Sequence, residues 1–404
     1  MNIVVGVTGG IAAYKTVHLV RLLTKAGHDV TVVPTEDALR FVGTPTWEAI
    51  SRHPVTTSVH DDVAKVRHVA LGQAADLVIV APATANTIAS MTAGLASDLL
   101  GTTLLATVAP VVIAPAMHAE MWRHPATQAN IATLRSRGVH LVGPAEGELA
   151  GGDTGPGRMS EPEEIFAAAE ALLTPRDLAG LRVVVSAGGT REPIDPVRFL
   201  GNRSSGRQGV ALAAEAAARG ADVVLVAAHV ESDVRAMAKH PSVRIENVGT
   251  AAELSVAMAD AAADADVIIM AAAVADYRPA RVAEHKLTKE QGVLDRIDLV
   301  ENEDVVAGLA AARSAGGAPD GQTIVAFAAE TLTDADERRE RARRKRERKG
   351  VDLLAVNLAD AEHGFERADN AIEIIGADGA VVGEASGSKR EVATAIWDAV
   401  QMVR

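Results

Sequence analysis

Short apolar runs recur along the chain, and most are separated by stretches with the spacing of a helix that buries one face. In the first part of the chain we expect strands at Ile3–Val7, Val30–Val33, Leu77–Val80, Leu104–Val112 and Val139–Val142. Helices are expected at Ile11–Ala26, Ala83–Met91, Asn130–Arg137 and Glu161–Leu173. Strands that alternate with helices in this rhythm predict a parallel sheet covered by helices on both faces.

The same alternation restarts after Thr174–Gly180, which we interpret as a domain boundary. Further strands are expected at Leu181–Ser186, Val223–Ala227, Val267–Met270, Ile324–Ala328 and Leu353–Val356. Helices at Gln208–Arg219 and Ser388–Arg404, and an edge hairpin of Ala371–Ile375 with Ala380–Gly383, complete the pattern. The predicted fold class is α/β, with two doubly wound parallel-sheet domains at residues 1–175 and 181–404.

Three stretches follow predicted strands, and open parallel sheets bind ligands beyond those strand ends. The turn Thr8–Ile11 leads into a helix N-terminus, which suits the phosphate of a mononucleotide, because the full glycine spacing of dinucleotide sites is missing. Pro82–Thr87 offers hydroxyl and amide groups for a ligand or a plain helix cap. Val111–Trp122 gathers two methionines, a histidine and a tryptophan, which form either a core plug or a pocket wall.

Ala150–Met159 holds too much glycine and proline for a regular element, so we expect a flexible loop there.

Composition narrows the class of protein. A length of 404 residues exceeds what one hydrophobic core usually holds. A net charge of −13 with 2% aromatic residues argues against a nucleic-acid partner. The absence of cysteine excludes disulfides and a catalytic thiol. The chain enters a strand at once and has no long apolar run, so we expect a cytoplasmic protein without a membrane partner.

Ordered motifs give a more specific indication. The first half carries G-V-T-G-G-I-A-A-Y-K at Gly6–Lys15, then His68, Pro82–Thr87, P-A-M-x-x-x-M-W and G-D-T-G-P-G-R-M. In this order they resemble the flavodoxin-like FMN domain of phosphopantothenoylcysteine decarboxylase. The second half resembles phosphopantothenate–cysteine ligase at Gly188–Arg198, Asn202–Gly206, Ala271–Tyr277 and Phe327–Thr331. Nearly end to end, the chain is similar to the bacterial bifunctional proteins of coenzyme A biosynthesis that fuse the two.

The decarboxylase resemblance implies that FMN oxidises the cysteinyl thiol of 4′-phosphopantothenoylcysteine, that CO2 then leaves, and that reduction gives 4′-phosphopantetheine. His68 matches the family's active-site base. The residues that match its FMN site are Gly9, Gly10, Ile11, Ala12, Thr84, Asn86, Pro115, Ala116 and Met117. The residues expected near the substrate are His118, Met121, Trp122, Arg158 and Met159.

The first half departs from the family's pattern at two positions. His118 stands where the family usually carries an asparagine that is expected to hold the substrate carboxylate, and an imidazole N–H can do the same. Gly151 stands where a flap cysteine commonly donates the proton of the final reduction. We therefore expect His118 or a water molecule to donate that proton.

The ligase resemblance implies that CTP, with Mg2+, activates the carboxylate of 4′-phosphopantothenate as an acyl-cytidylate, which the cysteine amine then attacks. The residues that match the nucleotide site are Asp276, Lys286, Asn302, Glu303, Asp304, Val305, Phe327, Lys345 and Lys349. Arg198 and Asn202 match positions that act on the acyl-cytidylate, and no metal ligands are assigned. For the charged run Asp336–Lys349, a solvated helix is the alternative, and a nucleic-acid arm is disfavoured by its interspersed acids.

The resemblance also implies a homo-oligomer, a dodecamer in which trimeric flavin domains share FMN and ligase domains form dimers. Two other functions stay open at this stage. One is a non-catalytic flavin-binding regulator in the first half beside an active ligase. The other is a nicotinamide-dependent dehydrogenase, which the incomplete glycine pattern disfavours.

Overall fold

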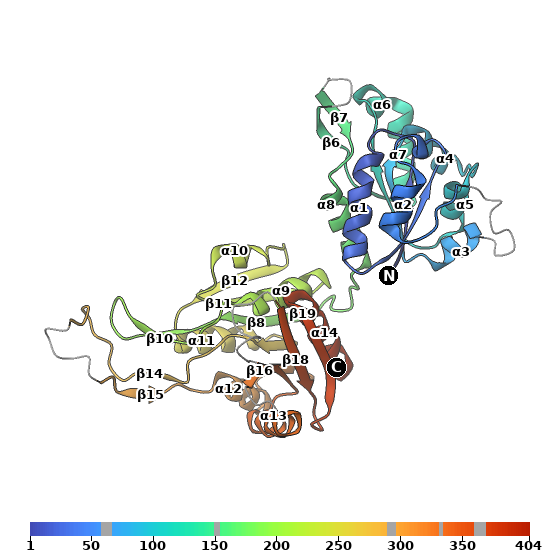
Figure 1. Ribbon diagram of the computed structural model, residues 1–404. Helices are drawn as coiled ribbons and strands as arrows, with labels where there is room; N and C mark the ends of the chain where they lie inside the picture. The colour runs from blue at the N-terminus through green and yellow to red at the C-terminus, as the bar shows by residue number, and fades with distance from the viewer. Residues whose placement is uncertain (58–66, 149–153, 289–295, 331–333, 359–368) are drawn as a thin grey trace. The chain divides into compact units, whose positions relative to one another are not determined.

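The computed structural model describes residues 1–57, 67–148, 154–288, 296–330, 334–358 and 369–404. These residues form two compact units, Met1–Pro175 and Arg176–Arg404, and each unit has its own parallel sheet (Figure 1). Among the described helices, none is both long and apolar enough to span a membrane.

The first unit is built on a five-stranded parallel sheet in the order β2-β1-β3-β4-β5. Its strands are β1 (Asn2–Val7), β2 (Asp29–Pro34), β3 (Leu77–Ala83), β4 (Val111–Pro115) and β5 (His140–Leu141). Its helices are α1 (Ala13–Lys25), α2 (Thr44–Ser51), α3 (Arg67–Ala74), α4 (Ala85–Ala93), α5 (Leu99–Ala106), α6 (Ala119–Arg123), α7 (Pro125–Ser136) and α8 (Pro162–Leu173), with a short 3-10 helix at Ala38–Arg40. An antiparallel hairpin of β6 (Ala145–Glu148) and β7 (Thr154–Arg158) follows β5.

Neighbouring residues of β1 bury opposite faces of this sheet. Val5 belongs to the core cluster that contains Leu19 of α1 and Ile165 of α8. Val4 belongs to the cluster that contains Ile88 of α4 and Leu134 of α7. Helices therefore cover both faces, and α1 and α8 lie side by side on one of them (Figure 1).

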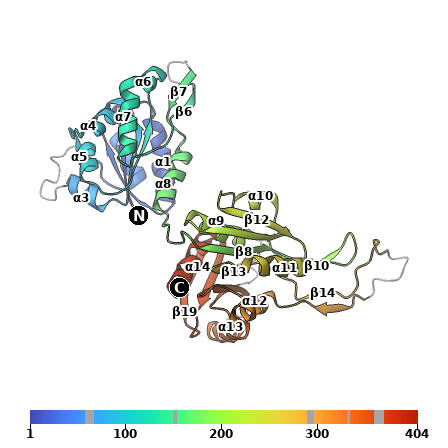
Figure 2. The same ribbon diagram turned by 180° about the vertical axis from the view of Figure 1, so that it is seen from behind.

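The second unit has an eight-stranded sheet in the order β12-β11-β8-β13-β16-β17-β18-β19, with its last two strands antiparallel. The strands are β8 (Arg182–Gly188), β11 (Asp222–Ala228), β12 (Val243–Val248), β13 (Val267–Met270), β16 (Thr323–Glu330), β17 (Leu353–Leu358), β18 (Asp369–Ile375) and β19 (Val381–Ser388). The helices are α9 (Arg207–Ala218), α10 (Ser232–Ala236), α11 (Ala251–Ala262), α12 (Val305–Ser314), α13 (Ala335–Lys349) and α14 (Lys389–Val403). α9 and α14 cover one face, and α11, α12 and α13 cover the other (Figure 2).

Two short hairpins extend from this second sheet. They are β9 (Arg191–Pro193) with β10 (Phe199–Gly201), and β14 (Tyr277–Pro279) with β15 (Leu299–Glu301). Both ribbon views show β14 and β15 reaching away from the sheet on the side of β10 (Figures 1 and 2).

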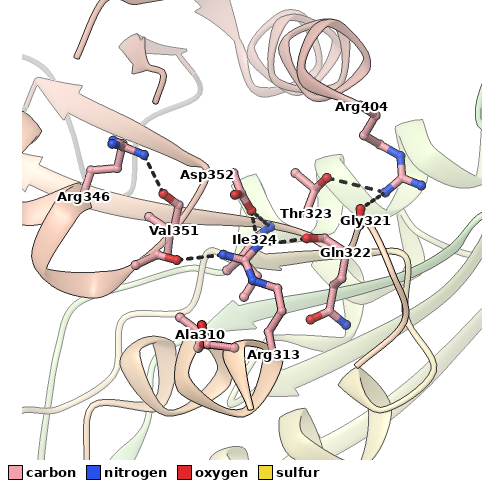
Figure 3. Close-up of polar contacts among 12 residues, drawn as sticks. Ala310, Arg313, Gly321, Gln322, Thr323, Ile324, Arg346, Val351, Asp352 and Arg404 are labelled. Atoms are coloured by element: carbon pink, nitrogen blue, oxygen red, sulfur yellow. Dashed lines mark hydrogen bonds and ion pairs between the residues drawn. The ribbon is translucent and has the colours of Figure 1, made fainter. Parts of the chain in front are cut away.

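A polar network stabilises the starts of the central strands of the second sheet (Figure 3). Arg313 of α12 pairs with Asp352, whose carboxylate also accepts the Ile324 N–H at 2.7 Å. Near the chain end, Arg404 donates to the Gly321 carbonyl at 3.3 Å. The contacts fasten α12 and α14 to the end of the sheet that lies opposite the carboxyl ends of its parallel strands.

The structure confirms the α/β class, the parallel sheets and the edge hairpin, but the strand predicted at Leu104–Val112 is wrong. Its first part ends α5, and β4 begins only at Val111. The Asp98 side chain caps α5 by accepting the Gly101 N–H at 2.7 Å. A short apolar run does not distinguish a buried helix from a strand, and leucine and alanine favour the helix. The helix predicted at Ala83–Met91 begins at Ala85, and that predicted at Asn130–Arg137 is the second half of α7.

The irregular loop predicted at Ala150–Met159 is wrong for Thr154–Arg158, which forms β7. The Met117 N–H donates to the Gly157 carbonyl at 2.9 Å, and a Cβ on Gly157 would lie 2.2 Å from the Met117 carbonyl oxygen. This glycine, at φ 144°, therefore permits close packing of the hairpin against the segment after β4. Residues 150–153 lie outside the described residues.

Candidate functional sites

A cleft of about 1260 Å3 opens at the carboxyl ends of the first unit's strands. The segments that follow β1, β2, β3 and β4 all contribute to its wall. Of the residues expected at FMN, those lining it are Gly9, Gly10, Ile11, Ala12, Thr84, Asn86, Ala116 and Met117. Pro115 is the buried last residue of β4 and is not among the lining residues.

Thr8 joins two parts of the cleft wall. Its Oγ1 donates to the Pro82 carbonyl at 2.7 Å and accepts the Thr84 N–H at 3.1 Å. The turns after β1 and β3 are therefore held together. α1 begins beside them without a side-chain cap at Ala12, so the positive end of its dipole favours an anion there.

The chemistry of the cleft fits FMN. The uncapped start of α1 and the hydroxyl and amide groups of Thr84 and Asn86 suit a phosphate and a polyol chain. Met91, Met117 and Met121 add polarisable apolar surface that suits a flat ring.

Residues expected at the substrate also reach this cleft: His118, Met121, Arg158 and Met159. Glu161 binds Arg158 at 2.6 Å and Lys15 at 2.8 Å, which ties β7 to α1. The hydrogen bond from Lys15 is the largest cause of a pKa of Glu161 below its ordinary value. The carboxylate thus stays ionised and holds two cations at the cleft.

Two expected residues lie elsewhere. Trp122 is half-buried and packs against the core cluster that contains Leu134. His68, near the start of α3, is half-buried and is not among the residues that line the cleft. Its Nδ1 is buried and has no hydrogen-bond partner within the described part of the chain. Gly151, at the position of the family's flap cysteine, falls outside the described residues.

Several residues of the cleft wall were not predicted from the sequence, and they include Lys15, Thr35, Glu36, Asp37, Ser90 and Glu148. For Thr35–Asp37 a signal existed, because these residues directly follow a strand that the sequence predicted. Lys15 and Ser90 lie within helices, and the sequence gives no indication of the direction in which they point.

In the second unit, the residues after β13 bring several of the expected ligase residues together. Asn202 Nδ2 donates to the Val274 carbonyl at 3.0 Å. Asn302 Nδ2 donates to the Ala275 carbonyl at 2.8 Å, and the Asn302 N–H donates to the Asp276 carbonyl at 2.8 Å. Residues from three distant parts of the chain therefore meet at the carboxyl end of β13.

The expected lysines of α13 each face a carboxylate. Lys349 Nζ binds the two oxygens of Asp304 at 2.9 and 2.8 Å, and Lys345 Nζ lies 3.7 Å from Glu330. Asp304 also caps α12 by accepting the Ala307 N–H at 3.2 Å. Burial raises the pKa of Asp304, but the contacts with Lys349 and Ala307 outweigh it and leave the pKa below its ordinary value.

Arg198 contacts the segment that carries Lys286. Arg198 pairs with Asp195 at 3.4 Å and donates to the carbonyl of Leu287, which follows the exposed Lys286. Phe327 is half-buried in β16, Glu303 is exposed and Val305 is buried at the start of α12. Within the described residues, no group of three or more His, Asp or Glu side chains forms a metal site.

The comparisons with known proteins cover both units. The Flavoprotein family matches residues 1–174, and the DNA/pantothenate metabolism flavoprotein C-terminal domain matches residues 178–403. The chain is 51% identical over 404 residues to the coenzyme A biosynthesis bifunctional protein CoaBC of Mycolicibacterium smegmatis, covering 99% of this chain and 97% of that protein. The chain belongs to this bifunctional family.

Two further proteins are similar to this chain. The CoaBC protein of Escherichia coli K12 is 44% identical over 384 residues, which cover 94% of this chain and 91% of that protein. A crystal structure of the C-terminal domain of a CoaBC protein shares 32% identity, covers 55% of this chain and 95% of its own, and gives a TM-score of 0.43. Membership in this family does not favour the dehydrogenase or the non-catalytic regulator.

Proposed function

We infer that the chain carries out two consecutive reactions of coenzyme A biosynthesis. The second unit ligates cysteine to 4′-phosphopantothenate with CTP, and the first decarboxylates the product with FMN to give 4′-phosphopantetheine. The observation that carries this assignment is the presence of two separate sites in one chain, each at the carboxyl ends of a parallel sheet and each containing residues that the family's motifs mark.

In the ligase site, cations and amides are supplied by different elements. Lys286, Lys345 and Lys349 neutralise the triphosphate and the departing pyrophosphate, and Mg2+ accompanies these phosphates. Asp276 and Asn302 hold the nucleotide, while Arg198 and Asn202 orient the acyl-cytidylate toward the cysteine amine. Because Asp304 and Glu330 already hold Lys349 and Lys345, these ammonium groups need little rearrangement when the nucleotide binds.

In the decarboxylase site, the protein orients the substrate and moves protons, and bound FMN supplies the redox chemistry. The turn Gly9–Ala12 with Thr84 and Asn86 holds the cofactor's phosphate end. His118 holds the substrate carboxylate and, in a chain without cysteine, donates the proton of the final step either directly or through water. Arg158 provides a second cation beside the substrate.

His68 needs a neighbouring copy to act as the active-site base. Because it is not among the residues that line the cleft of its own unit, we propose that first units assemble so that His68 of one copy completes the cleft of the next. A trimer is the assembly that the family resemblance suggests.

The second units are proposed to pair through the two projecting hairpins. Exposed apolar side chains gather there, with Phe199 at 50%, Tyr277 at 46% and Leu299 at 47% exposure. A second copy would remove this surface from water.

The test of the proposed function starts with the absorption spectrum of the purified protein. We expect a yellow protein that releases FMN on denaturation and liberates CO2 from 4′-phosphopantothenoylcysteine. A colourless protein that cannot be reconstituted with FMN would contradict the assignment of the first unit.

A further inference from the structure

Two segments of the second unit that are far apart in sequence are in direct contact. One is the turn Ile194–Arg198 between β9 and β10, in which the Ile194 N–H donates to the Arg198 carbonyl at 2.9 Å. The other is Ala283–Leu287, which carries Lys286. The Ala283 N–H donates to the Ile194 carbonyl at 3.0 Å, so the two backbones are joined directly.

The side chain of Asp195 is at the centre of this contact and is 0% exposed. Its Oδ1 accepts the N–H groups of Val197 and Arg198, each at 2.8 Å. Its Oδ2 accepts the Leu287 N–H at 3.2 Å and lies 3.4 Å from Arg198 Nε. Arg198 in turn donates to the Leu287 carbonyl. Both carboxylate oxygens and both backbone groups of Leu287 therefore take part in one closed set of contacts.

The charge of Asp195 is part of this arrangement. Burial raises the pKa of its carboxyl, but the N–H groups of Val197, Arg198 and Leu287, together with the Arg198 guanidinium, outweigh it and leave the pKa below its ordinary value. The group is thus a carboxylate at neutral pH. An asparagine in its place would weaken the pairing with Arg198 and would turn one acceptor oxygen into an NH2 group.

We propose that Asp195 is a positioning residue for the ligation reaction: it holds the backbone that carries Lys286 against the turn that carries Arg198. The Lys286 side chain is exposed, and the anchored Leu287 next to it determines where its ammonium group can reach. This inference rests on the proposed ligase function, in which Lys286 and Arg198 act on the nucleotide and the acyl-cytidylate.

The test compares Asp195→Asn with Asp352→Asn in the full-length protein. Asp352 serves as the control because its carboxylate, like that of Asp195, combines backbone N–H acceptance with an arginine pair, although it accepts one N–H where Asp195 accepts three, and it lies at the other end of the sheet (Figure 3). Activation is measured as the burst of pyrophosphate from CTP, 4′-phosphopantothenate and Mg2+ without cysteine. We expect Asp195→Asn to slow this burst by about 10- to 100-fold, as misplaced catalytic groups do, while Asp352→Asn keeps the wild-type rate.

A double mutant separates positioning from simple stabilisation. Because Asp195 acts in part through Lys286, the loss of rate in Asp195→Asn combined with Lys286→Gln should be smaller than the product of the two single losses. If the two losses multiply, or if Asp195→Asn lowers Tm but keeps the wild-type burst, the inference is wrong. Ala283→Pro is a second variant, which removes the N–H that donates to the Ile194 carbonyl. It should also slow the burst, and combined with Lys286→Gln its loss of rate should again be smaller than the product of the two single losses. A wild-type protein that fails to ligate would instead contradict the proposed function.

Discussion

Lys349 Nζ lies 2.8 Å from one carboxylate oxygen of Asp304 and 2.9 Å from the other, and this pair joins the end of α13 to the start of α12. The same carboxylate caps α12 through the Ala307 N–H. A lysine and an aspartate that the family resemblance assigns to the nucleotide are therefore held together before any nucleotide binds. A cation whose position is already set stabilises phosphate charge without reorganising.

Removing this ammonium group should weaken nucleotide use. We expect Lys349→Gln to raise the KM for CTP about tenfold, because one charge-assisted contact to phosphate is lost. Arg344→Gln is the control, since Arg344 on the same helix is 68% exposed and faces Glu340. Initial rates of pyrophosphate release measure the KM of each variant for CTP. Equal KM values for the two variants would show that Lys349 does not bind the nucleotide.

Replacing His68 should separate the two activities. His68→Asn is expected to abolish CO2 release from 4′-phosphopantothenoylcysteine and to leave CTP-dependent ligation at the wild-type rate, because the base belongs to the first unit only. Loss of both activities in a folded variant would contradict the assignment of two sites.

Mixed oligomers test whether copies share a cleft. Asn86→Leu alters the cleft wall, whereas His68→Asn alters a residue outside it, and each variant alone should be inactive in decarboxylation. Co-expression of the two should restore activity in those clefts that combine a normal wall with a normal His68. If the mixture stays inactive, His68 acts within its own copy.

The contact of Gly157 with Met117 gives a prediction for the hairpin. Gly157→Ala would push a Cβ to 2.2 Å from the Met117 carbonyl oxygen, and β7 must move away from the cleft. We expect weaker FMN retention and slower decarboxylation, with normal ligation. Gly138→Ala is the control, because that glycine also has a positive φ, of 84°, but nothing lies within 4 Å of its Cβ position. Equal FMN content in the two variants would contradict the role of this contact.

A charge on the projecting hairpin should prevent pairing of the second units. Leu299→Asp is expected to reduce the mass of the assembly in light scattering, since a carboxylate would have to be buried against a second copy. Val256→Asp, on the exposed side of α11, should leave the mass unchanged. Identical masses for both variants would place the interface elsewhere.

Arg219 links stability to pH at the start of the second unit. Its guanidinium, 2% exposed, binds Asp177 at 2.8 Å and Asp398 at 2.7 Å. The hydrogen bond from Arg219 is the largest cause of a pKa of Asp177 below its ordinary value. The stability that this pair contributes is thus present above the unfolded pKa of about 4 and is lost as the pH falls through the lower folded value.

Asp177→Asn should therefore lower the free energy of unfolding at pH 7, and its difference from the wild type should shrink below about pH 4. Urea denaturation at several pH values measures this difference. The control is Asp264→Asn, since Asp264 is 80% exposed and its pair with Arg182 should contribute little. A difference that grows in acid would contradict the linkage.

The sequence predicted the parts of the fold that depend on local patterns. Continuous apolar runs indicated most central strands, because a strand buried on both faces has no polar alternation. The run at Leu104–Val112 failed because helix and strand look alike over so few residues. β7 was missed because Gly157 serves packing against Met117, a contact that no local pattern reveals.

The residues of the candidate sites could likewise be predicted from the sequence only in part. Motifs placed Gly9, Thr84 and Met117 at the cleft, because residues after parallel strands meet at one edge of the sheet. Asp195 was part of a recognised motif, but its partner Leu287 lies 92 residues away, so its role is visible only in three dimensions. The family resemblance assigned His68 the role of active-site base, but the sequence did not indicate that this residue lies outside the wall of its own cleft.

The most direct test of the account is a mass-resolved analysis of products from 4′-phosphopantothenate, cysteine, CTP and Mg2+ with the purified full-length protein. We expect 4′-phosphopantetheine, CMP, pyrophosphate and CO2, formed by a chain that contains no cysteine. Accumulation of 4′-phosphopantothenoylcysteine by the FMN-loaded protein would contradict it, because the first unit would then bind flavin without decarboxylating.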